Sequence, residues 1–296
     1  MLWRLRPMLE HRITLRIGRL RTLAAGKTLF VFIPGLFFMA SLAEATDVGT
    51  TSNLGETGTW IMTLGAGIEY GPKFPGSKHH GFSAMPSFDI RRFDEPDENS
   101  APDDNIDYGL IDVGGFEAGP VLGFRDSRSH SDDDGLKGIH SVHWGVDAGV
   151  FAQYWAIPNR LRFRSEIRQA VSDGSGLVVD VGADWFKPLG EKWLFSAGPR
   201  ASFGNGAYMR KYFGISSTEA SQNGALPTFD AKSGLKSIGF TASAAYDVTP
   251  TWTLQLYDRF DRPTGDAADS PITSKLGAKN QNVIGISLSK AFSVNF

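Results

Sequence analysis

The chain has no cysteine among its 296 residues. This absence excludes a disulfide framework and thiolate metal sites, so stability must come from hydrogen bonds and packing. No apolar run of 18 residues follows Thr46, which excludes a membrane-spanning helix from that part of the chain. Residence in a membrane would then require a β-barrel or attachment at the surface.

The chain also lacks an excess of basic residues, with 30 Lys and Arg against 32 Asp and Glu. The first 45 residues contain seven basic and two acidic side chains and so carry a charge of +5. Because the whole chain carries −2, residues 46–296 carry −7. A nucleic-acid-binding domain needs a basic face, and nucleic acid is therefore excluded as a partner.

The N-terminus has the pattern of a secretory signal. An Arg-rich stretch from Arg4 to Lys27 precedes an apolar run from Thr28 to Leu42, and Ala43-Glu44-Ala45 follows as an A-x-A site. Residues 1–45 are predicted to be a signal peptide that is cleaved before Thr46. The pattern indicates export to the outer membrane of a Gram-negative bacterium, with residues 46–296 as one domain.

Side chains alternate with period two along the last fifteen residues, Asn282 to Phe296. One face of such a strand suits lipid and the other suits a polar, crowded lumen. About twelve similar segments recur from Thr59 onward, and most begin or end on Trp, Tyr or Phe. Aromatic side chains at both ends of the strands are typical of the two membrane interfaces. The sequence therefore predicts an all-β fold, a single antiparallel transmembrane β-barrel of about 12 strands.

Several contacts follow from this fold. The barrel would lie in outer-membrane lipid and lipopolysaccharide, and its C-terminal strand would carry the signal for the barrel-assembly machinery. The residues of that assembly signal are Phe292, Val294 and Phe296.

Charged side chains occupy the inward positions of the predicted strands. The set that we expect to form a charge ladder in the lumen is Arg162, Arg164, Glu166, Arg168, Asp180, Asp184, Arg200 and Arg259. If Val171 faces Leu177 across the hairpin, then Arg168 lies opposite Asp180 and Arg164 opposite Asp184. Cross-strand pairs of opposite charge stabilise a ladder. The ladder either braces a narrow barrel or forms a charged selectivity filter for a solute.

Loop lengths leave the topology of residues 92–142 open. Outer-membrane barrels have short periplasmic turns and long outer loops, which places Gly214 to Ser233 and Arg262 to Asn280 outside. Twelve strands would then put the acidic segments Asp94 to Asp107 and Asp126 to His140 in the periplasm. Either this placement holds or a strand is miscounted near Ile106 to Gly115.

The loop from Gly265 to Ile272 is a second candidate site. Gly265-Asp266 and Ser270-Pro271 are turn formers, and Asp266 and Asp269 could fold inward to meet Arg259 or Arg200. The loop would then be a plug or constriction of the lumen. The alternative is a structured outer loop with no role in binding.

No pattern in the chain predicts catalysis, a metal site or a cofactor. Ser141 and His140 are adjacent, so on a strand they point to opposite faces and cannot form a nucleophile and base pair. Asp132-Asp133-Asp134-Gly135 lacks the alternating ligands and the later Glu of an EF-hand, and His79-His80 lacks a third ligand at a recognisable spacing. The protein is therefore not expected to be an enzyme.

Several short stretches resemble the MltA-interacting protein/outer membrane protein V (MipA/OmpV) family. They are Leu64-Gly65-Ala66-Gly67 with Pro72, Phe74 and Gly76-Ser77; Gly119 to Gly123; Leu136-Lys137-Gly138; Tyr208-Met209 with Tyr212 to Ser216; and Gly265 to Ile272. The segment Phe260 to Thr264 looks longer than is usual in the family, and the acidic stretch Asp94 to Asp107 is particular to this chain.

The resemblance implies an outer-membrane barrel with a structural or scaffolding role in the cell envelope. The name-giving member joins a membrane-bound lytic transglycosylase to a bifunctional peptidoglycan synthase, so these two enzymes are the partners that the resemblance implies. Relatives named after outer membrane protein V are described as osmotically responsive proteins and adhesins. A narrow solute pore and an adhesin acting through its outer loops therefore remain alternatives.

Overall fold

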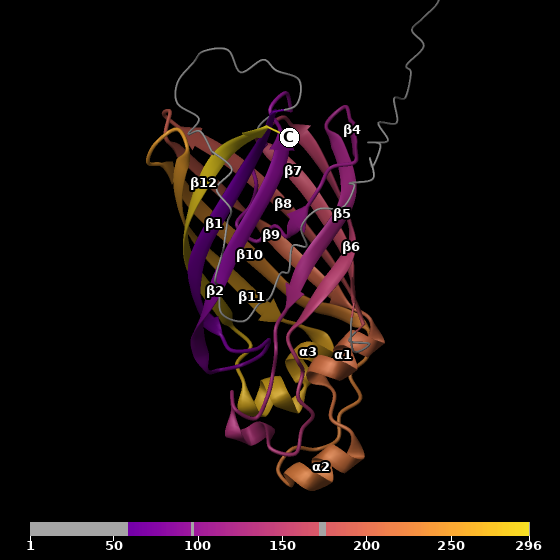
Figure 1. Cartoon of the computed structure of the whole chain (residues 1–296). Helices are drawn as coiled ribbons and strands as arrows, with labels where there is room; N and C mark the ends of the chain where they lie inside the picture. Colours follow the sequence, from indigo (N-terminus) through magenta and orange to yellow (C-terminus); the bar gives the residue numbers. More distant parts are fainter. Residues whose placement is uncertain (1–58, 96–97, 172–175, 296) are drawn as a thin grey trace, which may run out of the picture. The chain divides into compact units, whose positions relative to one another are not determined.

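The computed structural model describes residues 59–95, 98–171 and 176–295. The predicted signal peptide and Phe296 lie outside these residues. The described chain forms one antiparallel sheet that curls into a barrel, with helices gathered at one end (Figure 1). No helix in the described residues is long and apolar enough to cross a membrane.

Ten long strands and two short ones make up the sheet. They are β1 (Thr59–Pro72), β2 (His80–Arg92), β3 (Ile106–Asp107), β4 (Ile111–Val113), β5 (Phe116–Arg125), β6 (Gly145–Ile157), β7 (Leu161–Ala170), β8 (Leu177–Leu189), β9 (Trp193–Gly204), β10 (Gly234–Asp247), β11 (Trp252–Pro263) and β12 (Gln281–Asn295). The order around the sheet is β2-β1-β12-β11-β10-β9-β8-β7-β6-β5-β3, and β4 also pairs with β5. The predicted all-β barrel of about 12 strands is confirmed.

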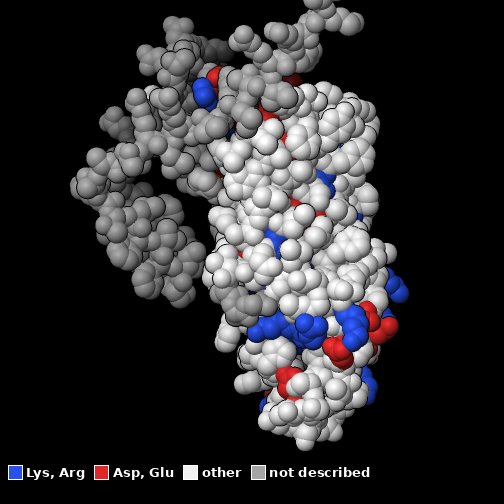
Figure 2. All heavy atoms as spheres, turned by 90° about the vertical axis from the view of Figure 1, so that its right-hand side faces the viewer, with Lys and Arg blue, Asp and Glu red and all other residues white. Residues whose placement is uncertain are grey.

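The outer face of the barrel is apolar because every second side chain points away from the lumen. Phe82, Val150 and Leu256 are exposed on it, and each of these side chains has more than half of its surface accessible. Aromatic residues lie near the strand ends, where Trp193 packs on Tyr246 with ring centroids 4.7 Å apart and Phe124 on Trp144 at 5.8 Å. On the face in Figure 2, few charged side chains interrupt this wall, and most gather below it.

β2 and the β3–β4 pair run in the same direction. Each pair of neighbouring strands in the sheet is antiparallel. An even number of steps separates β2 from β3 in the strand order, so the two strands run in the same direction. Within the described residues no ladder joins β2 to β3. The connection between them must therefore run back towards the end of the barrel at which β2 begins, and it does so inside the barrel.

This connection settles the topology that the loop lengths left open. β5 begins after the short turn at Gly114 and Gly115 and runs towards the end of the barrel that carries the other long loops. The segment Asp126 to His140 follows β5 and therefore lies at that end. Of the two alternatives, the placement of both acidic segments in the periplasm is wrong, because residues of Asp126 to His140 belong to the buried cluster at the other end. Residues 98–107 of the other acidic segment lie inside the barrel, and the stretch from Ile106 to Gly115 holds two short strands, β3 and β4, that both pair with β5.

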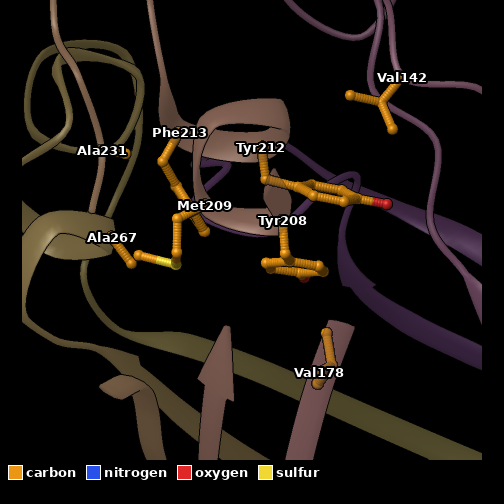
Figure 3. Packing of buried hydrophobic residues seen from close by; sticks show 8 residues of the cluster. All are labelled: Val142, Val178, Tyr208, Met209, Tyr212, Phe213, Ala231 and Ala267. Carbon is orange, nitrogen blue, oxygen red and sulfur yellow. The ribbon is translucent and has the colours of Figure 1, made fainter. Parts of the chain in front are cut away.

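A cap covers the end of the barrel that carries the long loops. It comprises a 3-10 turn (Asp134–Leu136), α1 (Gly206–Phe213), α2 (Ser217–Asn223), α3 (Gly265–Asp269) and a π-helical turn (Ile272–Leu276). Tyr208, Met209 and Phe213 of α1 pack on Ala267 of α3, and Val178 of β8 lies beneath them (Figure 3). A second buried cluster joins Phe74 and Ile272 to Leu136. Buried apolar residues thus connect the loops of the cap to one another.

Two charged residues share the face of the apolar side chains on β11 and β12, Asp258 and Lys290, and they are not cross-strand neighbours. Lys290 lies opposite Trp252, and its ammonium group is 5.3 Å from the centroid of that ring. Asp258 instead accepts a hydrogen bond from Asn282 at 2.8 Å. Each charge therefore has a partner of its own near one end of the wall.

One glycine inside the barrel makes room for an aromatic ring. Tyr257 of β11 lies directly opposite Gly285 of β12, and a Cβ on Gly285 would be 2.2 Å from the Tyr257 ring. Because that ring belongs to a buried side chain, it has little room to move away.

We predict that Gly285→Ala lowers the free energy of unfolding by roughly 1–3 kcal/mol, the usual cost of overpacking. Gly234→Ala is the matched control, because a Cβ there meets nothing within 4 Å. Urea unfolding in detergent micelles, followed by the heat-modifiable mobility of the barrel, measures both. Equal midpoints for the two variants would contradict the prediction.

Candidate functional site

The connection between β2 and β3 lies within the barrel from residue 99 onward. Asn99 is anchored at the turn between β6 and β7, where its Nδ2 donates to the Asn159 carbonyl at 3.0 Å. Ala101 is buried, and Asn105 then donates to Glu166 of β7 at 2.7 Å. We call residues 98–107 the plug segment, since it lies inside the barrel against the inner face of the wall.

Three carboxylates of the plug segment bind arginines of the wall. Asp104 accepts two hydrogen bonds from Arg162, at 2.7 and 2.9 Å. Asp103 accepts two from Arg200, both at 2.9 Å, and Asp107 accepts one from Arg164. Two parallel N–H···O bonds between an Arg and a carboxylate form a strong and directional contact.

Asp103 also contacts the strand next to β9. Its Oδ2 accepts a hydrogen bond from the Thr241 hydroxyl of β10 at 3.0 Å. The plug segment is therefore bound to the inner face of consecutive strands, from β7 to β10.

The same arginines also pair with carboxylates of the wall. Asp184 of β8 bridges Arg162 and Arg200 at 2.8 and 2.6 Å. Glu166 lies 2.8 Å from Arg164 and 3.2 Å from Arg168, and Arg168 also binds Asp180. The aromatic ring of Phe151 lies 4.4 Å from the Arg164 guanidinium. The buried charges are thus linked in one continuous network.

The predicted partners along the ladder need correction. Across β7 and β8, Gln169 faces Leu177, so Arg164 lies opposite Gly182 and Arg168 opposite Val178. The cross-strand pairs are Arg162 with Asp184 and Glu166 with Asp180. Because the shift is by two residues, every side chain keeps its predicted face. Arg168 still reaches Asp180 diagonally.

A charged cavity of about 340 Å³ lies between the plug segment and the cap. Its walls include Arg125, Lys236 and Arg259, together with Asp126 and Asp147. Arg125 pairs with Asp147 at 2.8 Å, and the remaining member of the predicted ladder, Arg259, lies 3.2 Å from Asp261. The walls of the cavity carry charged side chains of both signs.

The loop from Gly265 to Ile272 is part of the cap. Asp266 accepts a hydrogen bond from the Lys232 backbone N–H at 2.6 Å, and Asp269 lies 3.5 Å from Lys279. Ser270 is buried and donates to the Phe213 carbonyl at 2.6 Å. The prediction that Asp266 and Asp269 meet Arg259 or Arg200 is wrong. Gly265 begins α3 with a φ of +48°, a left-handed backbone conformation that glycine adopts without steric cost.

Arg128 and Glu219 hold the cap loops together. Arg128 is buried and donates to the Tyr212 carbonyl at 2.9 Å and to the His140 carbonyl at 3.1 Å. Its contact with Tyr212 satisfies a carbonyl in the last turn of α1, which has no partner within the helix. Burial lowers the pKa of Arg128 to about 10.

Glu219 lies in the first turn of α2, and its side chain contacts the loop that contains His140. Its Oε1 lies 2.5 Å from His140 Nδ1 and accepts a hydrogen bond from the His140 backbone N–H at 2.8 Å. Burial alone would raise the pKa of Glu219, but hydrogen bonds from Ser216 and His140 outweigh it and lower the pKa to about 2. His140 is therefore a structural residue of the cap.

The described residues contain no group of three or more His, Asp or Glu side chains placed to hold a metal ion. His79, one of the candidate metal ligands, lies 3.3 Å from Asp133 of the acidic loop. This contact joins two cap loops.

Sequence reasoning missed Asp103, Asp104 and Asp107 as members of the site. Their partners lie 97 residues away for Asp103 and Arg200, and 58 residues away for Asp104 and Arg162. The available signal was an imbalance of charge: inward arginines outnumber inward carboxylates on the strands from Arg160 to Phe203, while an acidic segment had no assigned place.

We predict that Arg162→Met lowers the free energy of unfolding by roughly 3–5 kcal/mol, because it leaves Asp104 and Asp184 buried without their partner. Arg210→Met, at an exposed position on α1, is the control and should change stability little. Chemical unfolding of the refolded barrels measures the difference. A change as small in Arg162→Met as in Arg210→Met would show that the network does not stabilise the fold.

We predict that Glu219→Gln loosens the cap and that the effect depends on pH. A carboxyl group whose pKa falls from 4.5 to about 2 on folding stabilises the cap fully above pH 4.5. That contribution is lost as the pH falls through about 2. Hydrogen exchange of residues 206–223 should therefore be faster in Glu219→Gln than in wild type at pH 6, and the difference should shrink towards pH 2.

Glu191→Gln, in an exposed turn at the other end of the barrel, is the control for this experiment. A difference that stays constant from pH 6 to pH 2 would contradict the role assigned to Glu219.

Several solved structures match this chain at low identity. OprB from Pseudomonas putida is 13% identical with a TM-score of 0.35, and the match covers 61% of this chain and 46% of that chain. An outer membrane channel from Pseudomonas putida F1 is also 13% identical with a TM-score of 0.35, and the match covers 83% of this chain and 100% of that one. Neisserial surface protein A is 12% identical with a TM-score of 0.22 over 81% of this chain and 98% of that chain.

No curated protein matches the sequence significantly. The family model for the MltA-interacting protein MipA matches residues 64–292, which include almost the whole barrel and its cap. The chain is an outer-membrane β-barrel that belongs to the MipA family.

Proposed function

We propose that the protein is a closed structural barrel that scaffolds peptidoglycan-remodelling enzymes at the periplasmic face of the outer membrane. The occluded lumen carries this proposal. The plug segment fills part of the lumen, with three carboxylates bound to arginines of the wall, and the cap adds a buried apolar layer at the outer end. These two features narrow the path that a solute would need, which supports a structural role over transport.

The family supplies the class of partner. The family is described as that of the MltA-interacting protein, and the resemblance implies a lytic transglycosylase and a bifunctional peptidoglycan synthase. The periplasmic end presents short turns, among them Gly190–Lys192 and Val248–Thr251, together with the start of the acidic connection. We propose that these turns form the surface available to enzymes in the periplasm, and that the catalysis is theirs.

Other contacts follow from residence in the membrane. The exposed apolar wall contacts lipid, the charged cap lies at the level of lipopolysaccharide, and the closing strand β12 is recognised during assembly. The sequence begins with the segment that we take to be a cleaved signal for export.

A narrow pore is the second candidate, and the charged cavity favours it. Its walls carry several arginines and carboxylates, as a selectivity filter would. An adhesin would instead use the outer surface of the cap.

We predict no steady single-channel conductance for the refolded protein in a planar bilayer, either in wild type or in Arg164→Ala/Arg168→Ala. Both arginines are bound within the network, and the cap remains in place in the variant. Steady conductance that changes with the arginines would favour the pore and remove the argument for a closed scaffold.

We predict that the purified barrel binds the membrane-bound lytic transglycosylase and the peptidoglycan synthase in surface plasmon resonance. Asp94→Lys/Glu191→Lys reverses two exposed charges at the periplasmic end and should weaken binding at least severalfold. Lys275→Glu/Lys279→Glu reverses two exposed charges at the cap and is the matched control. Absence of binding to both enzymes, or equal loss in the two variants, would contradict the scaffold.

A further inference from the structure

The plug segment binds arginines whose positive charge is only partly balanced by carboxylates of the wall. Four arginines line this part of the lumen: Arg162, Arg164, Arg168 and Arg200. The wall carboxylates that contact them are three: Glu166, Asp180 and Asp184. Without the plug segment the group carries one excess positive charge, and with its three aspartates the excess becomes two negative charges.

The plug segment is held to the wall mainly by side chains. From Asp103 to Asn105, the contacts with the wall are those of Asp103, Asp104 and Asn105 side chains. The backbone hydrogen bond of Asp104 is to Ala101 within the segment itself. Ladder contacts begin only at Ile106, which pairs with Leu122. No described ladder joins β3 to β2, so the end of the plug segment is not fixed from that side.

The geometry of the contacts describes a ligand. Two consecutive residues, Asp103 and Asp104, place their carboxylates on two neighbouring guanidinium forks, those of Arg200 and Arg162. Asp184 lies between the forks and holds both in place, at 2.6 and 2.8 Å. A planar fork is preorganised for a carboxylate. The pair of forks therefore fits two carboxylates separated by a short carbon chain.

We infer that Arg162 and Arg200, supported by Arg164, form a binding site for a short di- or tricarboxylate, which the plug segment occupies as an internal substitute in the closed state. A soluble polycarboxylate that reaches the forks displaces Asp103 and Asp104, and the plug segment leaves the arginines. The site goes beyond the scaffold function and does not depend on it. The neighbouring cavity of about 340 Å³ gives space for the ligand.

Binding of propane-1,2,3-tricarboxylate to the refolded barrel in detergent micelles tests the inference. An internal competitor lowers the apparent affinity by the fraction of time that the site is open. Asp103→Asn/Asp104→Asn should therefore bind the probe about tenfold more tightly than wild type. Asp126→Asn/Asp261→Asn removes the same charge from the same cavity without touching the two forks, and it should leave the affinity nearly unchanged.

Arg162→Lys/Arg200→Lys keeps the charge but removes both forks. It should weaken binding at least tenfold in the background of Asp103→Asn/Asp104→Asn. Far-ultraviolet circular dichroism and heat-modifiable mobility show that each variant is folded. Inorganic phosphate can fill only one fork and should bind much more weakly than the tricarboxylate.

A crosslink tests displacement of the plug segment directly, because the chain has no cysteine of its own. Asp103→Cys/Thr241→Cys replaces two side chains through which the plug segment contacts the wall at 3.0 Å. A short cleavable thiol crosslinker should abolish binding of the tricarboxylate, and cleavage should restore it.

Three results would overturn the inference: no binding by folded Asp103→Asn/Asp104→Asn, binding that is equal in the lysine variant, or binding unaffected by the crosslink. Equal affinity for phosphate would overturn the assignment to a polycarboxylate. None of these results bears on whether the periplasmic turns retain enzymes, so failure of this site and failure of the scaffold are distinguishable.

Discussion

The balance of charge around the inward arginines is the constraint on which the rest of the structure depends. Guanidinium groups in a narrow barrel lose much of their hydration, and a desolvated charge is costly without a partner. β7 and β9 supply four arginines and β7 and β8 supply three carboxylates, so at least one further counter-charge must come from elsewhere in the chain. The connection between β2 and β3 supplies Asp103, Asp104 and Asp107.

The cap closes the other end by different physics. Its interior consists of Tyr208, Met209 and Phe213 packed on residues of the neighbouring loops, and the driving force is burial of apolar surface. Arg128 is the buried charge there, and it binds carbonyl groups at the end of α1 instead of a carboxylate. The barrel thus has an ionic closure within the lumen and an apolar closure outside, with a polar cavity between them.

The barrel was predictable from the sequence because its signals are local. Alternation with period two and aromatic residues at strand ends repeat within each strand, so the fold class and the inward or outward direction of Arg162, Arg164 and Asp184 followed. The partners across β7 and β8 did not follow, because a register shift of two residues preserves both faces and leaves the pattern of apolar and polar residues unchanged. Only the geometry of the turn distinguishes the two registers.

The plug segment was not predictable from the same signals, because its contacts join residues about 60 to 140 positions apart. An acidic run that contains proline has the composition of a solvated loop, and the carboxylates at Asp266 and Asp269 offered an alternative plug close to the predicted outer loops. The structure shows that those two aspartates pair with backbone and lysine within the cap.

The composition of the plug segment also explains why β2 and β3 run in the same direction. The connection runs in the opposite direction to both strands. It could therefore in principle join the wall as an antiparallel strand between β2 and β3 and so close the sheet. Residues 98–105 contain Pro102, which cannot donate to a ladder, and the aspartates at 103 and 104 are adjacent, so on a wall strand one of them would face lipid. Within the span of the membrane, the lumen is the place where these carboxylates find donors. The chemistry that keeps the segment out of the wall therefore also places it on the arginines.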